Sequence, residues 1–103
     1  MEVKNELILK NNKKSMKLLK IGAVWCKECL VMNPMWDEIE KEIPELKSEY
    51  FESDENPDLL DKYQVKEIPT FIFLDKDEKE ILHLEGLQNK EELVKIVKEN
   101  LNK

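Results

Sequence analysis

Residues 16–29 read MKLLKIGAVWCKEC, a mostly apolar run that leads directly into a pair of cysteines. Residues 16–25 have the length and the aliphatic content of a buried central strand. After Cys26, apolar residues recur every four positions, the spacing of one helix face, at Val31, Met35, Ile39 and Ile43. The sequence therefore predicts that Cys26 and Cys29 lie where a central strand ends and a helix begins.

Two prolines and a tryptophan add details to this predicted helix. Pro34 lacks the N–H that a helix interior needs, so we expect a kink near it. Pro44 is expected to end the helix, because proline cannot continue one. Trp36 is expected to be a half-buried packing residue on the same helix.

The rest of the chain alternates helix and strand signals. Strands are predicted at residues 46–52, 70–74 and 80–85, and the last two form an antiparallel hairpin around the polar turn at 75–79. Helices are predicted at 2–12, at 58–63 after the turn at 54–57, and after the N-cap residue Asn89. The order α-β-α-β-α-β-β-α predicts one α/β domain over residues 1–103, with helices on both faces of a mixed sheet.

Composition narrows the classes of partner. The length of 103 residues suits one domain, and 41% hydrophobic with 39% charged residues indicates a packed core under a charged surface. Seventeen Lys and Arg against 23 Asp and Glu give a net charge of −6, which disfavours binding to nucleic acid or to anionic membranes. No apolar run is long enough for a signal peptide or a membrane span, so we expect a cytoplasmic protein. We also expect a monomer.

The two cysteines favour redox chemistry. One pair makes no disulfide framework, and a structural zinc site needs four ligands. The Cys-x-x-Cys spacing closes a very small ring, and the first amides of a helix favour an anionic sulfur on Cys26. We therefore expect Cys26 to attack a disulfide and Cys29 to resolve the mixed disulfide that results.

Five motifs in order resemble the thioredoxin family. Trp25-Cys26-Lys27-Glu28-Cys29 joins a strand to a helix, and a proline follows five residues after Cys29. The other three are the turn Asp54-Glu55-Asn56-Pro57, Ile68-Pro69-Thr70 at the start of a strand, and Gly86 before the last helix. The resemblance covers the chain from about residue 16 to its end. It implies a thioredoxin-like fold with about four strands, in which the first strand of full thioredoxins is missing or replaced.

The resemblance also implies roles for particular residues. It implies that Pro69 is cis and faces the cysteines, and that Trp25, Ile68, Pro69 and Gly86 bind substrate. The substrates would be proteins that contain disulfides, and a donor similar to thioredoxin reductase would regenerate the dithiol. No metal or cofactor is implied.

The chain departs from the family pattern around the cysteines. Thioredoxins usually have Gly-Pro between them, where this chain has Lys27 and Glu28. The lysine would stabilise a Cys26 thiolate and the glutamate would oppose it, so reductant, isomerase and oxidant roles stay open. Lys20 stands where the family commonly has a buried acidic residue. It is either a buried amine that tunes the cysteines or an ordinary side chain whose stem reaches outward to solvent.

Three functions follow from these observations. The first is a thiol-disulfide oxidoreductase that acts as a cytosolic reductant through Cys26 and Cys29. The second is a binding module in which the pair, shared across a homodimer, holds a metal ion or an iron-sulfur cluster. The third is an interaction domain without redox activity.

Overall fold

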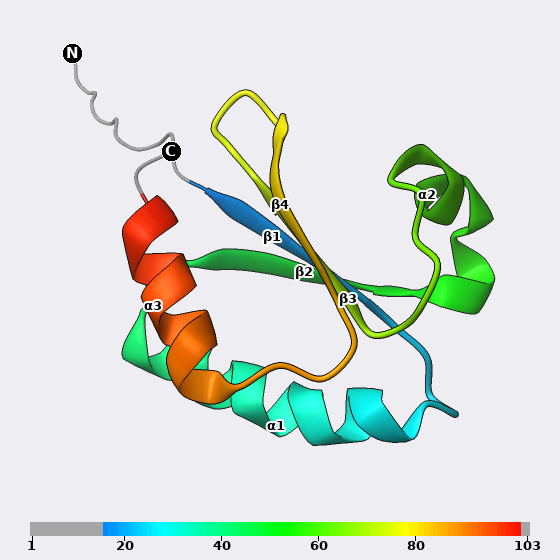
Figure 1. Cartoon of the computed structure of the whole chain (residues 1–103), viewed down its shortest axis with the longest axis horizontal. Helices are drawn as coiled ribbons and strands as arrows, with labels where there is room; N and C mark the ends of the chain where they lie inside the picture. Colours follow the sequence, from blue (N-terminus) through cyan, green and yellow to red (C-terminus); the bar gives the residue numbers. More distant parts are fainter. Residues whose placement is uncertain (1–15, 102–103) are drawn as a thin grey trace, which may run out of the picture.

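The computed structural model describes residues 16–101. The helix expected at residues 2–12, and the question of whether the first strand is missing or replaced, lie outside these residues. The elements in chain order are β1 (Lys17–Gly22), α1 (Lys27–Glu42), β2 (Lys47–Glu52), the short 3-10 helix η2 (Ser53–Glu55), α2 (Pro57–Lys62), β3 (Thr70–Leu74), β4 (Glu80–Glu85) and α3 (Lys90–Asn100) (Figure 1).

The four strands form one mixed sheet in the order β2-β1-β3-β4. β1 runs parallel to β2 and antiparallel to β3, and β3 and β4 form the predicted antiparallel hairpin. The register of β1 and β2 pairs Lys20 with Tyr50 and Gly22 with Glu52. Alternate residues of a strand point to one face and paired neighbours share it, so these four residues lie on the same face of the sheet.

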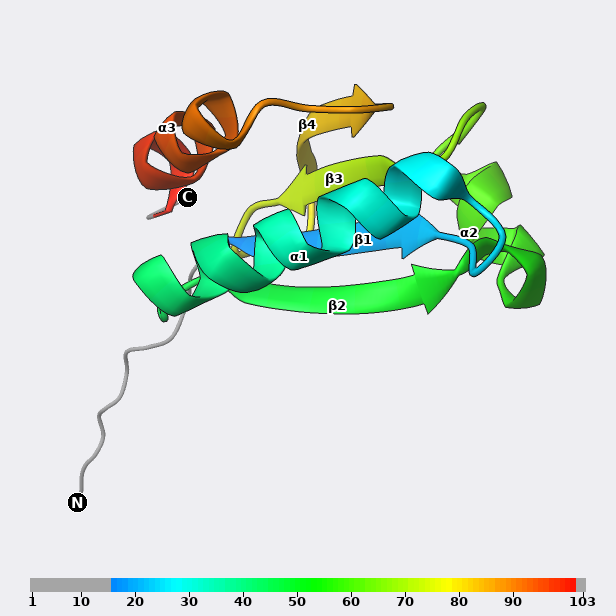
Figure 2. The ribbon, with the colours of Figure 1, turned by 90° about the horizontal axis from the view of Figure 1, so that it is seen from below.

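Helices cover both faces of this sheet, as predicted. α1 and α3 pack on one face around Leu18 and Phe73, and Figure 2 shows α1 lying across β1. On the other face, Ile21 and Ile72 pack with Leu59 of α2. β3 is therefore buried along its whole length. Each helix within residues 16–101 falls short of the length and apolarity needed to cross a bilayer.

The elements around the cysteines begin and end close to the predicted residues. β1 ends at Gly22, earlier than expected, because the Cys26 N–H donates to the Ala23 carbonyl at 3.1 Å and closes a turn. Trp25 consequently lies in the turn rather than in a strand. α1 begins directly after Cys26, runs through Pro34 and ends before Pro44. β3 and β4 occupy the predicted residues.

The buried face of α1 is displaced from the apolar spacing seen in the sequence. Its buried residues are Cys29, Met32, Trp36 and Ile39. Val31 is 57% exposed, although its spacing places it in line with Ile39. Apolar residues in the first turns of α1 form two neighbouring stripes along the helix. Both stripes have the spacing of a buried helix face, so the sequence pattern fits either one. The expectation of a half-buried Trp36 was wrong: it is 0% exposed, because α3 and the sheet enclose it.

The two tryptophans provide a matched test of this core. The Trp36 ring lies 5.3 Å from that of Phe71 and 6.4 Å from that of Phe73, between ring centroids. We expect Trp36→Ala to lower the free energy of unfolding by roughly 3–5 kcal/mol, because it leaves a cavity in the core. Trp25 is 64% exposed, so Trp25→Ala should cost less than about 1 kcal/mol. Urea unfolding followed by circular dichroism measures both, and equal losses would contradict this description of the core.

Candidate active site

Cys26 caps the N-terminus of α1 with its sulfur. Its backbone is extended, and Sγ accepts a hydrogen bond from the Cys29 N–H at 3.2 Å. The Cys26 carbonyl in turn accepts the first helical bond, from the Leu30 N–H at 3.2 Å. An N-cap acceptor stabilises a helix start, and the amides and dipole of that start favour negative charge on it. This position therefore suits a thiolate nucleophile.

Cys29 lies one turn further along α1 and is 2% exposed. Burial raises the pKa of its thiol to about 12, and the adjacent Cys26 side chain adds to the shift. A hydrogen bond with the Ala23 backbone acts in the opposite direction. Cys29 is consequently a protonated thiol at neutral pH, and it must lose its proton before it can attack a disulfide.

The segment before β3 lies against Cys26. The Ile68 carbonyl is 3.9 Å from the Cys26 sulfur, and Ile68 packs with Ala23 and both cysteines. The Ile68–Pro69 peptide bond is cis. The Pro69 carbonyl accepts the N–H of Gly86 at 2.7 Å, so the segments before β3 and after β4 are joined beside the cysteine pair. Gly86 has a φ of +87°, which favours glycine there.

Two open pockets flank Ile68. One has a volume of about 490 Å³ and is lined by Glu28, Lys66, Glu67, Ile68, Gly86 and Leu87. The other has a volume of about 190 Å³ and is lined by Trp25, Ser53, Leu60, Val65, Lys66, Glu67 and Ile68. The four residues predicted to bind substrate therefore lie together, since Trp25, Ile68 and Gly86 line these pockets and Pro69 follows Ile68.

Exposed apolar side chains surround the cysteine pair. Trp25 is held in place by a hydrogen bond from its indole Nε1 to Asp54 at 2.9 Å. The large apolar side chains exposed on the surrounding elements are Val24, Trp25, Leu30, Val31 and Leu87. Exposed apolar side chains beside a cysteine pair are typical of a surface that binds another molecule.

The structure separates the three residues predicted to tune the redox potential. Glu28 Oε1 lies 3.8 Å from the Cys26 sulfur, and Lys27 is exposed at the start of α1. The Lys20 ammonium instead contacts Glu40 at 2.7 Å, about three turns of α1 beyond Cys29. Ser48 donates to the same Glu40 oxygen at 2.8 Å. A tuning role for each of the three stays a prediction, and for Lys20 the ammonium is directed away from the sulfurs.

Two residues near Cys29, Tyr50 and Glu52, were missed in the sequence. A Cβ at Gly22 would lie 2.9 Å from the Cys29 sulfur and 3.3 Å from the Tyr50 hydroxyl. That hydroxyl donates to Glu52 Oε1 at 3.0 Å, and Glu52 Oε2 accepts the Val24 N–H at 3.1 Å. No local signal could have found this group, because it depends on the register that pairs Gly22 with Glu52.

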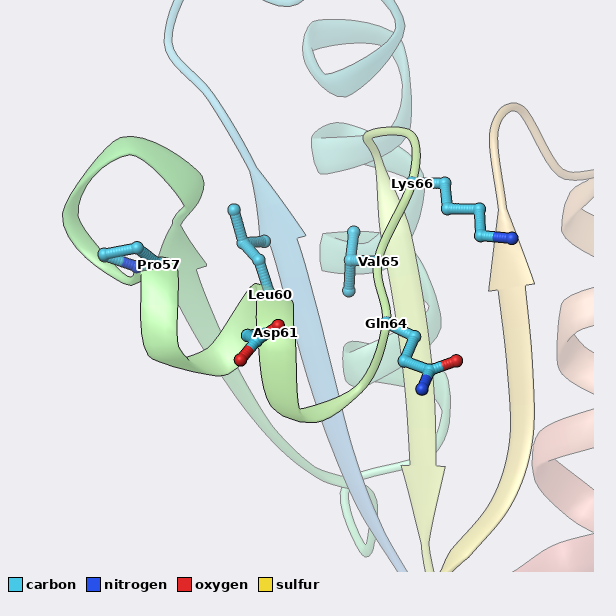
Figure 3. A pocket seen from close by; sticks show the side chains of 6 residues that line it. All are labelled: Pro57, Leu60, Asp61, Gln64, Val65 and Lys66. Carbon is cyan, nitrogen blue, oxygen red and sulfur yellow. The ribbon is translucent and has the colours of Figure 1, made fainter.

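A further open pocket lies beside α2, away from the cysteines. Figure 3 shows its lining residues, with a volume of about 520 Å³: Pro57, Leu60, Asp61, Gln64, Val65 and Lys66. Neither cysteine lines it. Within residues 16–101, no three or more His, Cys, Asp or Glu side chains are grouped so that they could hold a metal ion.

Comparisons with known proteins agree with this geometry. The model of the family described as Thioredoxin matches residues 1–97. Thioredoxin from Chlamydia trachomatis is 31% identical over 80 residues, which cover 78% of each chain. Human glutaredoxin-3 is 31% identical over 81 residues, 79% of this chain and 24% of that protein, so the chain spans about a quarter of its length.

A solved structure extends the likeness to the fold. Thioredoxin-2 of the malaria parasite superposes with a TM-score of 0.79 at 23% identity, over 86% of each chain. This confirms the predicted thioredoxin-like fold. The family match over nearly the whole length, together with the Cys-x-x-Cys pair at the start of α1, shows that the chain belongs to the thioredoxin family.

Proposed function

We propose that this protein is a thiol-disulfide oxidoreductase that reduces disulfides in other proteins. The observation that carries the proposal is the position of Cys26, whose sulfur accepts the Cys29 N–H at the start of α1 while the second thiol lies one turn behind it. Support also comes from family membership and from the apolar side chains and pockets around the pair. An extended polypeptide beside Ile68 would present its disulfide to Cys26.

The reaction has two exchange steps. The Cys26 thiolate attacks one sulfur of the substrate disulfide, and the other substrate sulfur leaves as a thiolate. Cys29 then loses its proton and attacks the Cys26 sulfur, which releases the second substrate thiol and closes the Cys26–Cys29 disulfide. The substrate gains two electrons and the protein loses two.

A donor must return these electrons before the next cycle. We propose a reductase similar to thioredoxin reductase as the donor and the cytoplasm as the compartment, because a reducing environment keeps such pairs as dithiols. In that compartment the pair would start each cycle as a dithiol, so we propose that exchange runs toward reduction of the substrate.

Removal of the resolving thiol should stop the reaction half-way. We expect Cys29→Ser to accumulate a stable mixed disulfide with oxidised glutathione on Cys26, because no second thiol is left to attack it. Mass spectrometry of the intact protein would show one added glutathione. The unaltered protein should instead form its internal disulfide.

Cys26→Ser is the matched control for this experiment. It retains the buried Cys29 and should form little adduct. Equal adducts in both variants would contradict the assigned order of the two cysteines. A purified protein that contains metal or is coloured, and that does not exchange with glutathione, would instead favour the metal or iron-sulfur module.

The difference between the two thiols should appear in alkylation. A pKa raised to about 12 means that Cys29 keeps its proton at every pH well below that value, and a thiol reacts far more slowly than a thiolate. At pH 8 we expect iodoacetamide to modify Cys26 at least about tenfold faster than Cys29 in the reduced protein. Peptide mapping at several pH values measures this, with Cys29 labelling that increases as the pH approaches 12. Equal rates at pH 8 would show that Cys29 is not a high-pKa thiol.

A further inference from the structure

We propose that Tyr50 and Glu52 carry the proton of Cys29 toward solvent during the resolving step, with the Tyr50 hydroxyl as relay and the Glu52 carboxylate as acceptor. The inference rests on the proposed function, since it concerns the second of the two exchange steps. It assigns a role to two residues of β2 that the cysteine motif does not contain.

The first support is the close approach of the Cys29 and Tyr50 side chains to Gly22. A single point, the position of a Cβ on Gly22, lies 2.9 Å from the Cys29 sulfur and 3.3 Å from the Tyr50 hydroxyl. The Cys29 sulfur and the Tyr50 hydroxyl can therefore be no further apart than the sum of these two distances. Gly22 has no side chain that would lie between them. A direct hydrogen bond after a small rotation, or one bridging water, spans such a separation.

The second support is the path from the interior to the surface. Cys29 is 2% exposed and Tyr50 is 42% exposed, so Tyr50 connects the buried thiol to solvent. The Tyr50 hydroxyl already donates to Glu52 Oε1 at 3.0 Å. The Val24 N–H fixes the other oxygen of Glu52 at 3.1 Å. The acceptor is thus held in place by the turn that leads into the cysteine motif.

The charges around this group suit a relay. Burial raises the pKa of Tyr50 to about 12, and the hydrogen bond and charge of Glu52 act in the same direction. Tyr50 therefore stays a neutral hydroxyl that can accept one proton while it donates another. The other charged or titratable groups facing this region are Cys26 before α1, Glu28 of α1 and the Lys20–Glu40 pair. Glu40 holds the Lys20 ammonium, and Glu28 lies against Cys26.

The proposed transfer balances. The Cys29 S–H bond breaks and its proton goes to the Tyr50 oxygen, while the proton of that hydroxyl goes to Glu52. Glu52 becomes a neutral acid and Cys29 a thiolate. The thiolate attacks Cys26 and forms the S–S bond, and the substrate sulfur leaves with the electron pair. Glu52 then releases its proton to solvent.

Stopped-flow reduction of 5,5′-dithiobis(2-nitrobenzoate) separates the two steps. Attack by Cys26 releases the first equivalent of coloured thiolate at a rate that depends on reagent concentration. Resolution by Cys29 releases the second equivalent at a rate that does not. In Tyr50→Phe and Glu52→Gln at pH 7, we expect the rate of the first phase to stay within about twofold of that of the unaltered protein. We expect the rate of the second phase to fall about tenfold or more.

The pH profile distinguishes a relay from a structural role. With an ionised Glu52 as acceptor, the second phase should change little with pH around neutrality. In Glu52→Gln, solvent base must take the proton from a high-pKa thiol, so that phase should accelerate about tenfold per pH unit. Glu49→Gln is the matched control, because Glu49 is an exposed residue of the same strand. Within residues 16–101 its one ion pair is with Lys17, at 3.9 Å. Its phases and their pH dependence should equal those of the unaltered protein.

Several outcomes would overturn the relay. They are a second phase unchanged in both variants, a change in Tyr50→Phe alone, and an equal slowing of both phases. Urea unfolding of each variant establishes that the protein measured is folded. Release of only one equivalent by the unaltered protein would overturn the proposed function itself, whereas two equivalents with unaffected variants would overturn the relay alone.

Discussion

The hydrogen bond from the Cys29 N–H to the Cys26 sulfur is the contact on which the site depends. It caps α1, and it places one sulfur at the helix start and the other a turn inside. The turn closed by the Ala23 carbonyl delivers Cys26 to that position and turns Trp25 outward. The same few residues therefore end a strand, start a helix and give the two sulfurs different positions, one at the helix start and one a turn inside.

The parallel pairing of β1 and β2 adds a second constraint. It places Gly22 beside Glu52 and Lys20 beside Tyr50 on the face that α1 covers. A side chain at Gly22 would meet the Cys29 sulfur and the Tyr50 ring and hydroxyl. The lack of a side chain there therefore both leaves room for the buried thiol and lets Tyr50 approach it. The Lys20 ammonium cannot occupy this space while it contacts Glu40 at 2.7 Å.

Local signals explain what could be predicted from the sequence. The apolar run before Cys26, the β-rich residues of β3 and β4 and the N-cap at Asn89 each act over a few residues, and the elements they predict are present. The face of α1 was misjudged because two apolar stripes share its first turns, and burial of Trp36 depends on α3, far along the chain. The Tyr50–Glu52 group needs the register of two strands joined through α1, which no short stretch of sequence encodes.

Different strands border the two sides of the cysteine pair. Ile68, Pro69 and Gly86 approach it from the β3 and β4 side, where the pocket beside Gly86 is open. Tyr50 and Glu52 belong to β2, which lies beyond β1 at the opposite edge of the sheet. A polypeptide bound in the pocket beside Gly86 would lie on the side of the pair away from β2. In the proposed reaction Cys29 loses its proton while the substrate is still attached to Cys26, so a proton exit at the β2 edge would allow resolution to proceed with the substrate in place.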